Sequence, residues 1–207
     1  MVSSTNKKSG KRTYQLGARA ESARRTREAI LDAAVRAFGD RWFDEVTLSD
    51  VAREAGVSQQ TVVNHFGSKE DLYLVGIAER WAPRIARLRS QVEAGDIDSV
   101  VHIAFEDYEQ TGVGTLRALA LAERSATLAG IVGAGGAAHH EWVAGALEPL
   151  LTELDDAVRL RAIRLCAVAL DVRTWEQLRK TQSADEARED MRALVESIVT
   201  AARHEFC

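Results

Sequence analysis

The sequence has few of the residues that interrupt helices or cross-link secreted proteins. Its 207 residues include two prolines and two cysteines, and Cys166 and Cys207 show neither a metal-binding nor a disulfide spacing. Nothing apolar follows the early lysines, so no signal peptide is indicated. No apolar run approaches the roughly 18 residues that a membrane helix needs. The sequence therefore predicts a reduced, cytoplasmic protein with no membrane segment.

Strand patterns are also missing. No stretch alternates apolar and polar residues over the length of a strand, and helical periodicity dominates. We predict an all-α fold of about nine helices, with a kink or split at Pro83. Glycine-rich breaks are expected at 112–114 and 130–136. The expected helices cover residues 22–38, 69–91, 98–110, 138–152, 155–180 and 184–204.

Charge is distributed unevenly along the chain. The net charge is −4, yet residues 1–27 carry eight lysines or arginines and a single acid, Glu21. This end is therefore +7 and the remainder −11. A basic end on an acidic body suggests a local patch for a polyanion, and a solvated, disordered tail is the alternative. We expect residues 1–20 to form a basic, flexible arm.

Residues 47–73 contain three closely spaced helix starts. Thr47 with Asp50 forms a capping-box pattern, and Gly56 is placed to end the helix that follows. Ser58 caps a second helix two residues later, so the two helices must cross steeply as a helix-turn-helix unit. Ser68 with Asp71 repeats the cap pattern.

The second helix of this unit has an unusual outward face. Helical spacing turns Val62 and Phe66 inward and leaves a small, uncharged set outward: Gln59, Gln60, Val63 and Asn64. Asn and Gln can bind adenine edges in the major groove, and valine can touch a thymine methyl. The flanking residues suit phosphate oxygens; they are Ser58, Thr61 and His65. A helix-turn-helix used only as a packing corner is the alternative.

Residues 24–73 resemble the tetracycline-repressor (TetR) family of bacterial regulators. The match runs from "RRTREAILDAAVRAFGDRWFDEVT" through "LSDVAREAGVSQQTVVNHFGSKEDLY". The resemblance implies a homodimer with a three-helix DNA-binding head at residues 21–75 and a ligand-binding and dimerisation body at 76–207. It also implies that Thr47, His65 and Lys69 lie beside phosphates. Gln60 replaces a usual small residue and Val63 a usual tyrosine, so the operator cannot be taken from a relative.

The basic residues before the head gain a role from this resemblance. We expect Arg24, Arg25 and Arg27 to approach the phosphates that flank the operator. The arm from Lys7 to Arg19 would enter a minor groove.

The body gives weaker signals for a ligand. A pocket between helices is mostly apolar with a few polar groups. Its candidate residues are Trp81, His102, Phe105, Tyr108, Arg117, His139 and Trp142, and ordinary packing is the alternative for each. His139 and His140 are adjacent, so they point about 100° apart and chelate one ion poorly. We predict no metal site and no cofactor.

The last two expected helices suggest a dimer. Apolar residues cover more than one stripe of 155–180, which fits burial by both its own domain and a partner; burial inside its own domain alone is the alternative. The interface candidates are Val168, Val172, Trp175, Leu194 and Ile198. A twofold dimer predicts a palindromic operator.

Taken together, the sequence favours a repressor that an unknown small-molecule effector releases from a double-stranded DNA operator. A ligand-blind repressor and an activator remain open alternatives. A helical enzyme is the alternative from another class. Against it, the sequence has no phosphate loop, nucleophile elbow or metal spacing.

Overall fold

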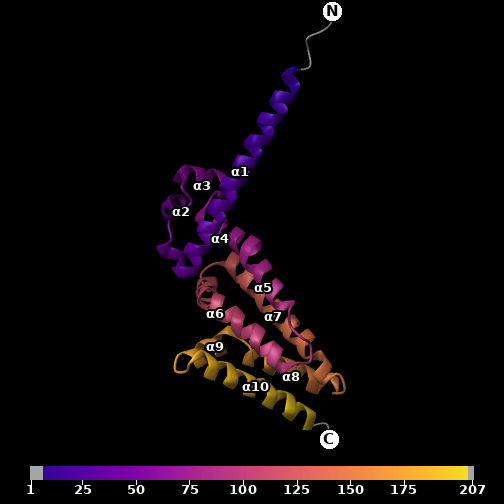
Figure 1. Ribbon diagram of the computed structural model, residues 1–207. Coiled ribbons are helices and arrows are strands. Elements are labelled where there is room, and N and C mark those ends of the chain that lie inside the picture. Colours follow the sequence, from indigo (N-terminus) through magenta and orange to yellow (C-terminus); the bar gives the residue numbers. More distant parts are fainter. Residues whose placement is uncertain (1–6, 205–207) are drawn as a thin grey trace, which may run out of the picture. The chain divides into compact units, whose positions relative to one another are not determined.

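The computed structural model describes residues 7–204, with side chains from residue 17 onward, and most of these residues are in helices (Figure 1). No strand occurs within these residues. The all-α prediction is therefore confirmed. The α-helices are α1 (Lys7–Asp40), α2 (Leu48–Glu54), α3 (Gln59–Phe66), α4 (Lys69–Gly76), α5 (Ala82–Arg89), α6 (Ile97–Ala122), α7 (Ala126–Leu151), α8 (Asp156–Ala169), α9 (Val172–Arg179) and α10 (Ala184–His204).

The chain divides into two compact units. The first runs to Trp81 and the second begins at Ala82, whereas the sequence placed this boundary after residue 75. A short 3₁₀-helix, Phe43–Glu45, and a π-helical segment, Ile77–Trp81, complete the first unit.

The first unit is built around α1, which packs against α2 and α4. Ile30, Leu31 and Phe38 of α1 are buried there. The helix begins at Lys7, so the predicted flexible arm is helical from that residue; its first six residues lie outside the described part. The reason is local, because residues 7–21 contain no proline and are mostly good helix formers. The helix also continues to Asp40, beyond the end predicted at residue 38.

Pro83 divides the predicted 69–91 helix as expected. The chain takes a π-helical turn at Ile77–Trp81 and resumes as α5, in which Pro83 is the second residue. Proline lacks an N–H group and its ring clashes with the carbonyl four residues earlier, so a wider turn before it accommodates both effects.

The second unit packs α6, α7, α8, α9 and α10 around one apolar core. The break expected at 112–114 is wrong, because α6 runs through it. Gly112 allows the indole of Trp175 to lie against the α6 backbone: a Cβ atom at this position would be 2.5 Å from the ring. The glycine at this position is therefore explained by packing against Trp175 and not by a turn.

The loop expected at 130–136 is also wrong, because α7 is continuous from Ala126 to Leu151. Its glycines do not make a turn, since none of Gly130, Gly133, Gly135 and Gly136 has a positive φ angle. Tertiary contacts elsewhere on α7, through buried residues such as Leu128, Val143 and Leu147, outweigh the low helix propensity of this stretch.

The predicted 155–180 helix is two helices. α8 ends at Ala169, and Asp171 caps α9 by accepting a hydrogen bond from the backbone N–H of Arg173. Leu170, between them, is fully buried. The aspartate cap was the local signal for this break.

Candidate nucleic-acid interface

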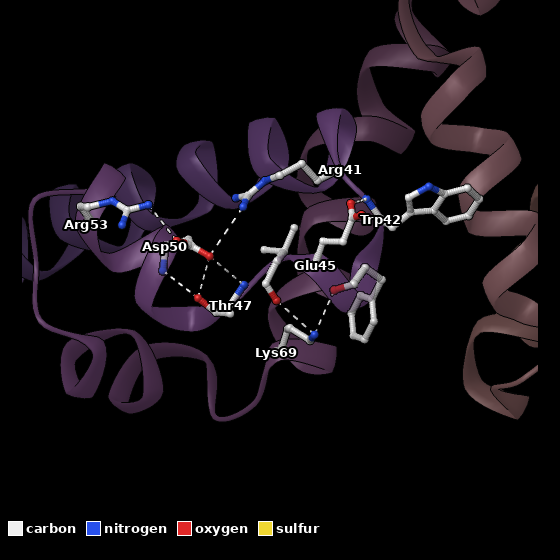
Figure 2. Close-up of polar contacts among 9 residues, drawn as sticks. Arg41, Trp42, Glu45, Thr47, Asp50, Arg53 and Lys69 are labelled. Atoms are coloured by element: carbon white, nitrogen blue, oxygen red, sulfur yellow. Dashed lines mark hydrogen bonds and ion pairs between the residues drawn. The ribbon is translucent and has the colours of Figure 1, made fainter.

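The start of α2 is fixed by a reciprocal cap. The backbone N–H of Asp50 donates to Oγ1 of Thr47, and the backbone N–H of Thr47 donates to the Asp50 carboxylate. The predicted capping box is therefore confirmed. Arg53 and Arg41 also pair with this carboxylate, at 2.7 and 3.6 Å (Figure 2). The hydrogen bond from Thr47, followed by the two arginines, holds the pKa of Asp50 below its usual value.

Lys69 fastens the start of α4 to the segment before α2. Its Nζ donates to the carbonyl oxygens of Phe43 and Val46, at 2.9 and 3.1 Å (Figure 2). The ammonium also lies 4.3 Å from the centroid of the Phe43 ring. These contacts use most of the donor capacity of Lys69 inside the unit, so they give it a structural role beside the predicted phosphate contact.

The turn between α2 and α3 follows the predicted chemistry. Gly56 has a φ angle of +69°, the left-handed conformation that favours glycine. Ser58 caps α3 by accepting from the backbone N–H of Thr61. The inner face of the two helices buries Val51, Val62 and Phe66. Two short, capped helices joined by a glycine turn make the helix-turn-helix unit.

The outward face of α3 is where the sequence placed it. Gln59, Gln60 and Asn64 are exposed, and Val63 is half-buried. Nε2 of Gln60 donates to Oδ1 of Asn64 at 2.9 Å, so these two amides are oriented as a pair. This face carries no charge and presents amide groups that can reach base edges.

The predicted phosphate residues lie around this face. Thr47 is exposed at the start of α2, and His65 is half-buried near the end of α3. The Oγ atoms of Ser58 and Thr61 lie 2.8 Å apart and share a hydrogen bond. The hydroxyl groups therefore already serve the cap, and each keeps either a lone pair or an O–H group for a further partner.

Two of the three predicted arginines have partners within the unit. Arg24 pairs with Glu21 at 2.8 Å, while Arg25 is exposed. Arg27 donates two hydrogen bonds of 2.7 Å to Glu79 and lies 5.2 Å from the centroid of the Phe66 ring. Its guanidinium thus links α1 to the π-helical segment.

Comparison with known proteins identifies relatives of the helix-turn-helix unit. Residues 30–75 match the family model described as bacterial regulatory proteins, tetR family. The helix-turn-helix unit is therefore of the tetR type over these residues. The chain is 36% identical over 90 residues to the HTH-type transcriptional regulator BetI of Agrobacterium fabrum. It is 40% identical over 85 residues to the HTH-type transcriptional regulator AlkX of Mycobacterium tuberculosis.

These matches are partial. Each covers 41% of this chain, and 44% of BetI or 37% of AlkX. The chain therefore spans about two fifths of the length of these relatives. Both relatives are named as regulators, which agrees with the prediction that the chain is not an enzyme. A solved transcriptional regulator from Rhodococcus sp. Rha1 has the same fold, with a TM-score of 0.65 at 16% identity; 87% of this chain and 97% of that one are covered.

The second unit holds a buried polar cluster, which comprises Arg89, Asp107, Tyr108, His139 and Trp142. Arg89 and Asp107 pair at 3.5 Å with side chains only 15% and 4% exposed. The indole Nε1 of Trp142 donates to the carbonyl oxygen of Arg89. Tyr108 donates its hydroxyl to the carbonyl of Leu170, at 2.9 Å.

Three members of this cluster were predicted pocket residues, and two were missed. Arg89 and Asp107 lie on different helices, so no spacing in the sequence relates them. A signal for Asp107 did exist, because it interrupts the apolar stripe that includes Ala104 and Tyr108. An acid at such a position is buried when its helix packs. Burial raises the pKa of Asp107, while the nearby Arg89 lowers it.

The other pocket candidates are not brought together with this cluster. Trp81 is in the first unit, with its ring 5.8 Å from that of Tyr73. His102 is exposed on α6, which argues against a place inside the body. Phe105 is packed in the apolar core, and Arg117 is half-buried further along α6.

The predicted interface residues fall into two groups. Val168 and Leu194 are 64% and 44% exposed, and Ile198 is half-buried. Val172 and Trp175 are buried in the core of their own unit, so their assignment to an interface is corrected. The division of 155–180 into two helices is the cause, because it turns α9 onto α6. Leu160 and Leu165 extend the exposed apolar face of α8, at 53% and 45%.

Within residues 7–204 no cluster of three or more His, Cys, Asp or Glu side chains is arranged to hold a metal ion. His139 and His140 have ring centroids 6.2 Å apart in a T-shaped arrangement. No helix in the described part is both long and apolar enough to cross a membrane.

Proposed function

We propose that this chain is a cytoplasmic transcriptional regulator that binds a palindromic DNA operator as a homodimer and is released by a small-molecule effector. The exposed, uncharged face of α3 carries the DNA-binding part of the proposal. Gln60 and Asn64 are oriented by a mutual hydrogen bond, while caps at Thr47 and Ser58 fix the two helices that present them. Such a face suits base edges in a major groove.

Selection of bound DNA from a random pool tests this proposal. We expect a palindrome whose half-sites lie about 34 Å apart or a multiple of that distance. Recovery of DNA with no common sequence would leave only non-specific binding, and no recovery would overturn the proposal. A reporter fused to the recovered operator, with and without the gene, then separates repression from activation.

The dimer rests on the exposed apolar side chains of α8 and α10. Leu160, Leu165, Val168 and Leu194 are large, apolar and well exposed, and α8 packs beside α10 within the same unit. Two copies of this helix pair could cover the residues by twofold packing as a four-helix interface.

Light scattering on purified variants tests the dimer. Val168→Glu would place a charge in the interface, so we expect monomers at micromolar concentrations. Val113→Glu is the matched control, since Val113 is also a valine, is 52% exposed, and lies on α6, which is not part of the proposed α8–α10 interface. A Val168→Glu protein that remains a dimer would exclude this face.

The third part of the proposal is that an effector releases the protein from DNA. The buried polar cluster in the second unit supports it, because buried polar groups that converge beside an indole are typical of ligand sites. By linkage, a ligand weakens DNA binding only by the factor by which it prefers the non-binding conformation. An operator affinity that no small molecule changes would favour a ligand-blind regulator.

A further inference from the structure

The buried polar cluster contains two nitrogen atoms without hydrogen-bond partners in the described part of the chain. They are Nε of Arg89 and Nδ1 of His139. His139 is 8% exposed and the Arg89 side chain 15%. An unsatisfied buried polar atom costs about 1–3 kcal/mol, so two in one cluster require a physical reason.

The hydrogen bond of His139 fixes what its other nitrogen can do. Nε2 lies 3.0 Å from the carbonyl oxygen of Ala167, which can only accept. Nε2 therefore carries the proton, and Nδ1 of the neutral ring is an acceptor. Nε of Arg89 always carries a proton and is a donor. The cluster thus leaves one donor and one acceptor open.

Both open atoms belong to side chains that adjoin the indole of Trp142. The guanidinium carbon of Arg89 lies 5.1 Å from the ring centroid, and the His139 ring centroid lies 6.3 Å from it. Asp107 balances the charge of Arg89 at 3.5 Å. The Arg89–Asp107 pair is therefore neutral as a whole, and an aromatic ring adjoins the two side chains that carry the open atoms.

We propose that Arg89 and His139 form the polar end of the effector site, and that the site takes an uncharged organic molecule through a hydroxyl group. This inference rests on the proposed effector release. A hydroxyl can donate to Nδ1 of His139 and accept from Nε–H of Arg89. A carboxylate cannot donate and would bring an unbalanced negative charge into a buried neutral cluster, while an ammonium group cannot accept.

The same cluster contacts the end of α8. His139 binds the carbonyl of Ala167 and Tyr108 that of Leu170, so both hold backbone groups where α8 stops. A hydroxyl that binds His139 therefore acts on the helix that carries the exposed Leu165 and Val168. This gives the effector a route to the surface that the proposed dimer would use.

The test uses the full chain without DNA. Three alcohols, 1-hexanol, 1-octanol and 1-decanol, are each compared with the methyl ether and the carboxylate of equal length. Melting temperature and tryptophan fluorescence report binding. We expect at least one alcohol to raise the melting temperature and change the fluorescence, with its ether and carboxylate at least about fivefold weaker, as for the loss of one hydrogen bond of about 1 kcal/mol.

Two variants assign the binding to the two atoms. Arg89→Lys keeps the charge beside Asp107 and removes the Nε donor. His139→Gln keeps an N–H group for the Ala167 carbonyl and removes the Nδ1 acceptor. Each is expected to weaken alcohol binding about fivefold. His102→Gln is the matched control, because His102 is exposed on α6 outside the cluster and its replacement keeps both open atoms, so its alcohol affinity should equal that of the natural chain.

Several outcomes would overturn the site. They are no response to any alcohol, equal responses to alcohol and ether, or unchanged affinity in both Arg89→Lys and His139→Gln; each means that water satisfies the two atoms. Failure of the proposed function is distinguishable. A chain that binds alcohols at these atoms and selects no DNA refutes DNA binding alone, and one that selects a palindrome and ignores alcohols refutes this site alone.

Discussion

Gln60 and Asn64 lie one turn apart on the exposed face of α3, and the amide of Gln60 donates to the amide oxygen of Asn64 at 2.9 Å. The bond leaves the Asn64 NH₂ group and the Gln60 oxygen open. Together they offer one donor and one acceptor, the pattern that pairs with the N7 and N6 positions of adenine. The two side chains therefore present a single reading unit.

The paired amides should act together in DNA binding. We expect Gln60→Ala and Asn64→Ala each to relax specificity at the same base pair, at a cost of about 1–3 kcal/mol. The double variant should lose little more than either single one, because each change already breaks the unit. Quantitative binding to the selected operator and to its single-base variants measures this.

Gln59→Ala is the control for this pair, since Gln59 is exposed on the same helix and has no part in the bond. All three variants should melt within a few degrees of the natural chain, as exposed substitutions usually cost under about 0.5 kcal/mol. Additive losses, or losses at two different base pairs, would mean that the amides read DNA separately.

The helical N-terminal extension should contribute electrostatic affinity. Removal of residues 1–18 deletes Lys7, Lys8, Lys11 and Arg12. Each phosphate that is no longer neutralised flattens the salt dependence of binding by about 0.9 in a log–log plot. We therefore expect weaker binding and a shallower slope in titrations across salt concentrations. A full-length chain with these four residues changed to glutamine should show the same shallow slope as the truncated chain. An unchanged affinity and slope would reject a role for the extension.

Arg27 offers a test between a contact to DNA and a contact within the head. It binds Glu79 through two hydrogen bonds of 2.7 Å, with the side chains 32% and 42% exposed. We expect Arg27→Glu to lower the free energy of unfolding by roughly 0.5–1 kcal/mol, the upper range for such a pair. The exchange Arg27→Glu with Glu79→Arg should recover it.

Operator affinity of the exchanged variant separates the two roles. If Arg27 acts through the head, the exchange restores DNA binding along with stability. Restored stability with a persistent loss of operator affinity would mean that Arg27 contacts DNA phosphates, as its position in the sequence predicts.

Local chemistry explains what could be predicted from the sequence. The caps at Thr47 and Ser58 and the turn at Gly56 involve residues only a few positions apart, so their spacing is visible in the chain. The same holds for the exposed face of α3, because it follows from helical periodicity once the caps are known.

Interactions between distant residues explain what could not be predicted. Gly112 was predicted to break a helix because its packing partner, Trp175, lies 63 positions away and cannot be inferred from local sequence. Trp175 was predicted to lie in an interface because 155–180 was expected to be one helix, whereas the cap at Asp171 begins a new one. Arg89 carried no signal at all, since its role depends on Asp107 and Trp142 from two other helices.

Gly112 should therefore be intolerant of a side chain. Gly112→Ala places a Cβ atom 2.5 Å from the Trp175 ring, which must shift within a filled core. We expect a loss of about 1–3 kcal/mol in the free energy of unfolding, measured by chemical denaturation. Gly135→Ala is the control: nothing lies within 4 Å of its added Cβ atom in α7, so it should stabilise by about 0.5–1 kcal/mol. Equal effects of the two substitutions would contradict the packing assigned to Gly112.

The pH dependence of stability should report the neutral state of His139. Burial, as the main cause, lowers its pKa from the ordinary 6.5, and the Arg89 charge adds to this, while the Ala167 carbonyl and Asp171 act in the opposite direction. The unfolded chain then binds a proton more readily than the folded one. Stability from this group is present above pH 6.5 and is lost as the pH falls below it.

Denaturation of the natural chain and His139→Gln between pH 7.5 and 5.5 measures this effect. We expect the free energy of unfolding to fall further with acidification in the natural chain than in the variant. Asp107 has the opposite sense, because burial raises its pKa, but it is present in both proteins and cancels in their difference. His140 is exposed and common to both as well. Parallel pH profiles would mean that His139 ionises freely in the folded chain, and its Nδ1 would then carry a proton and could not accept from a hydroxyl.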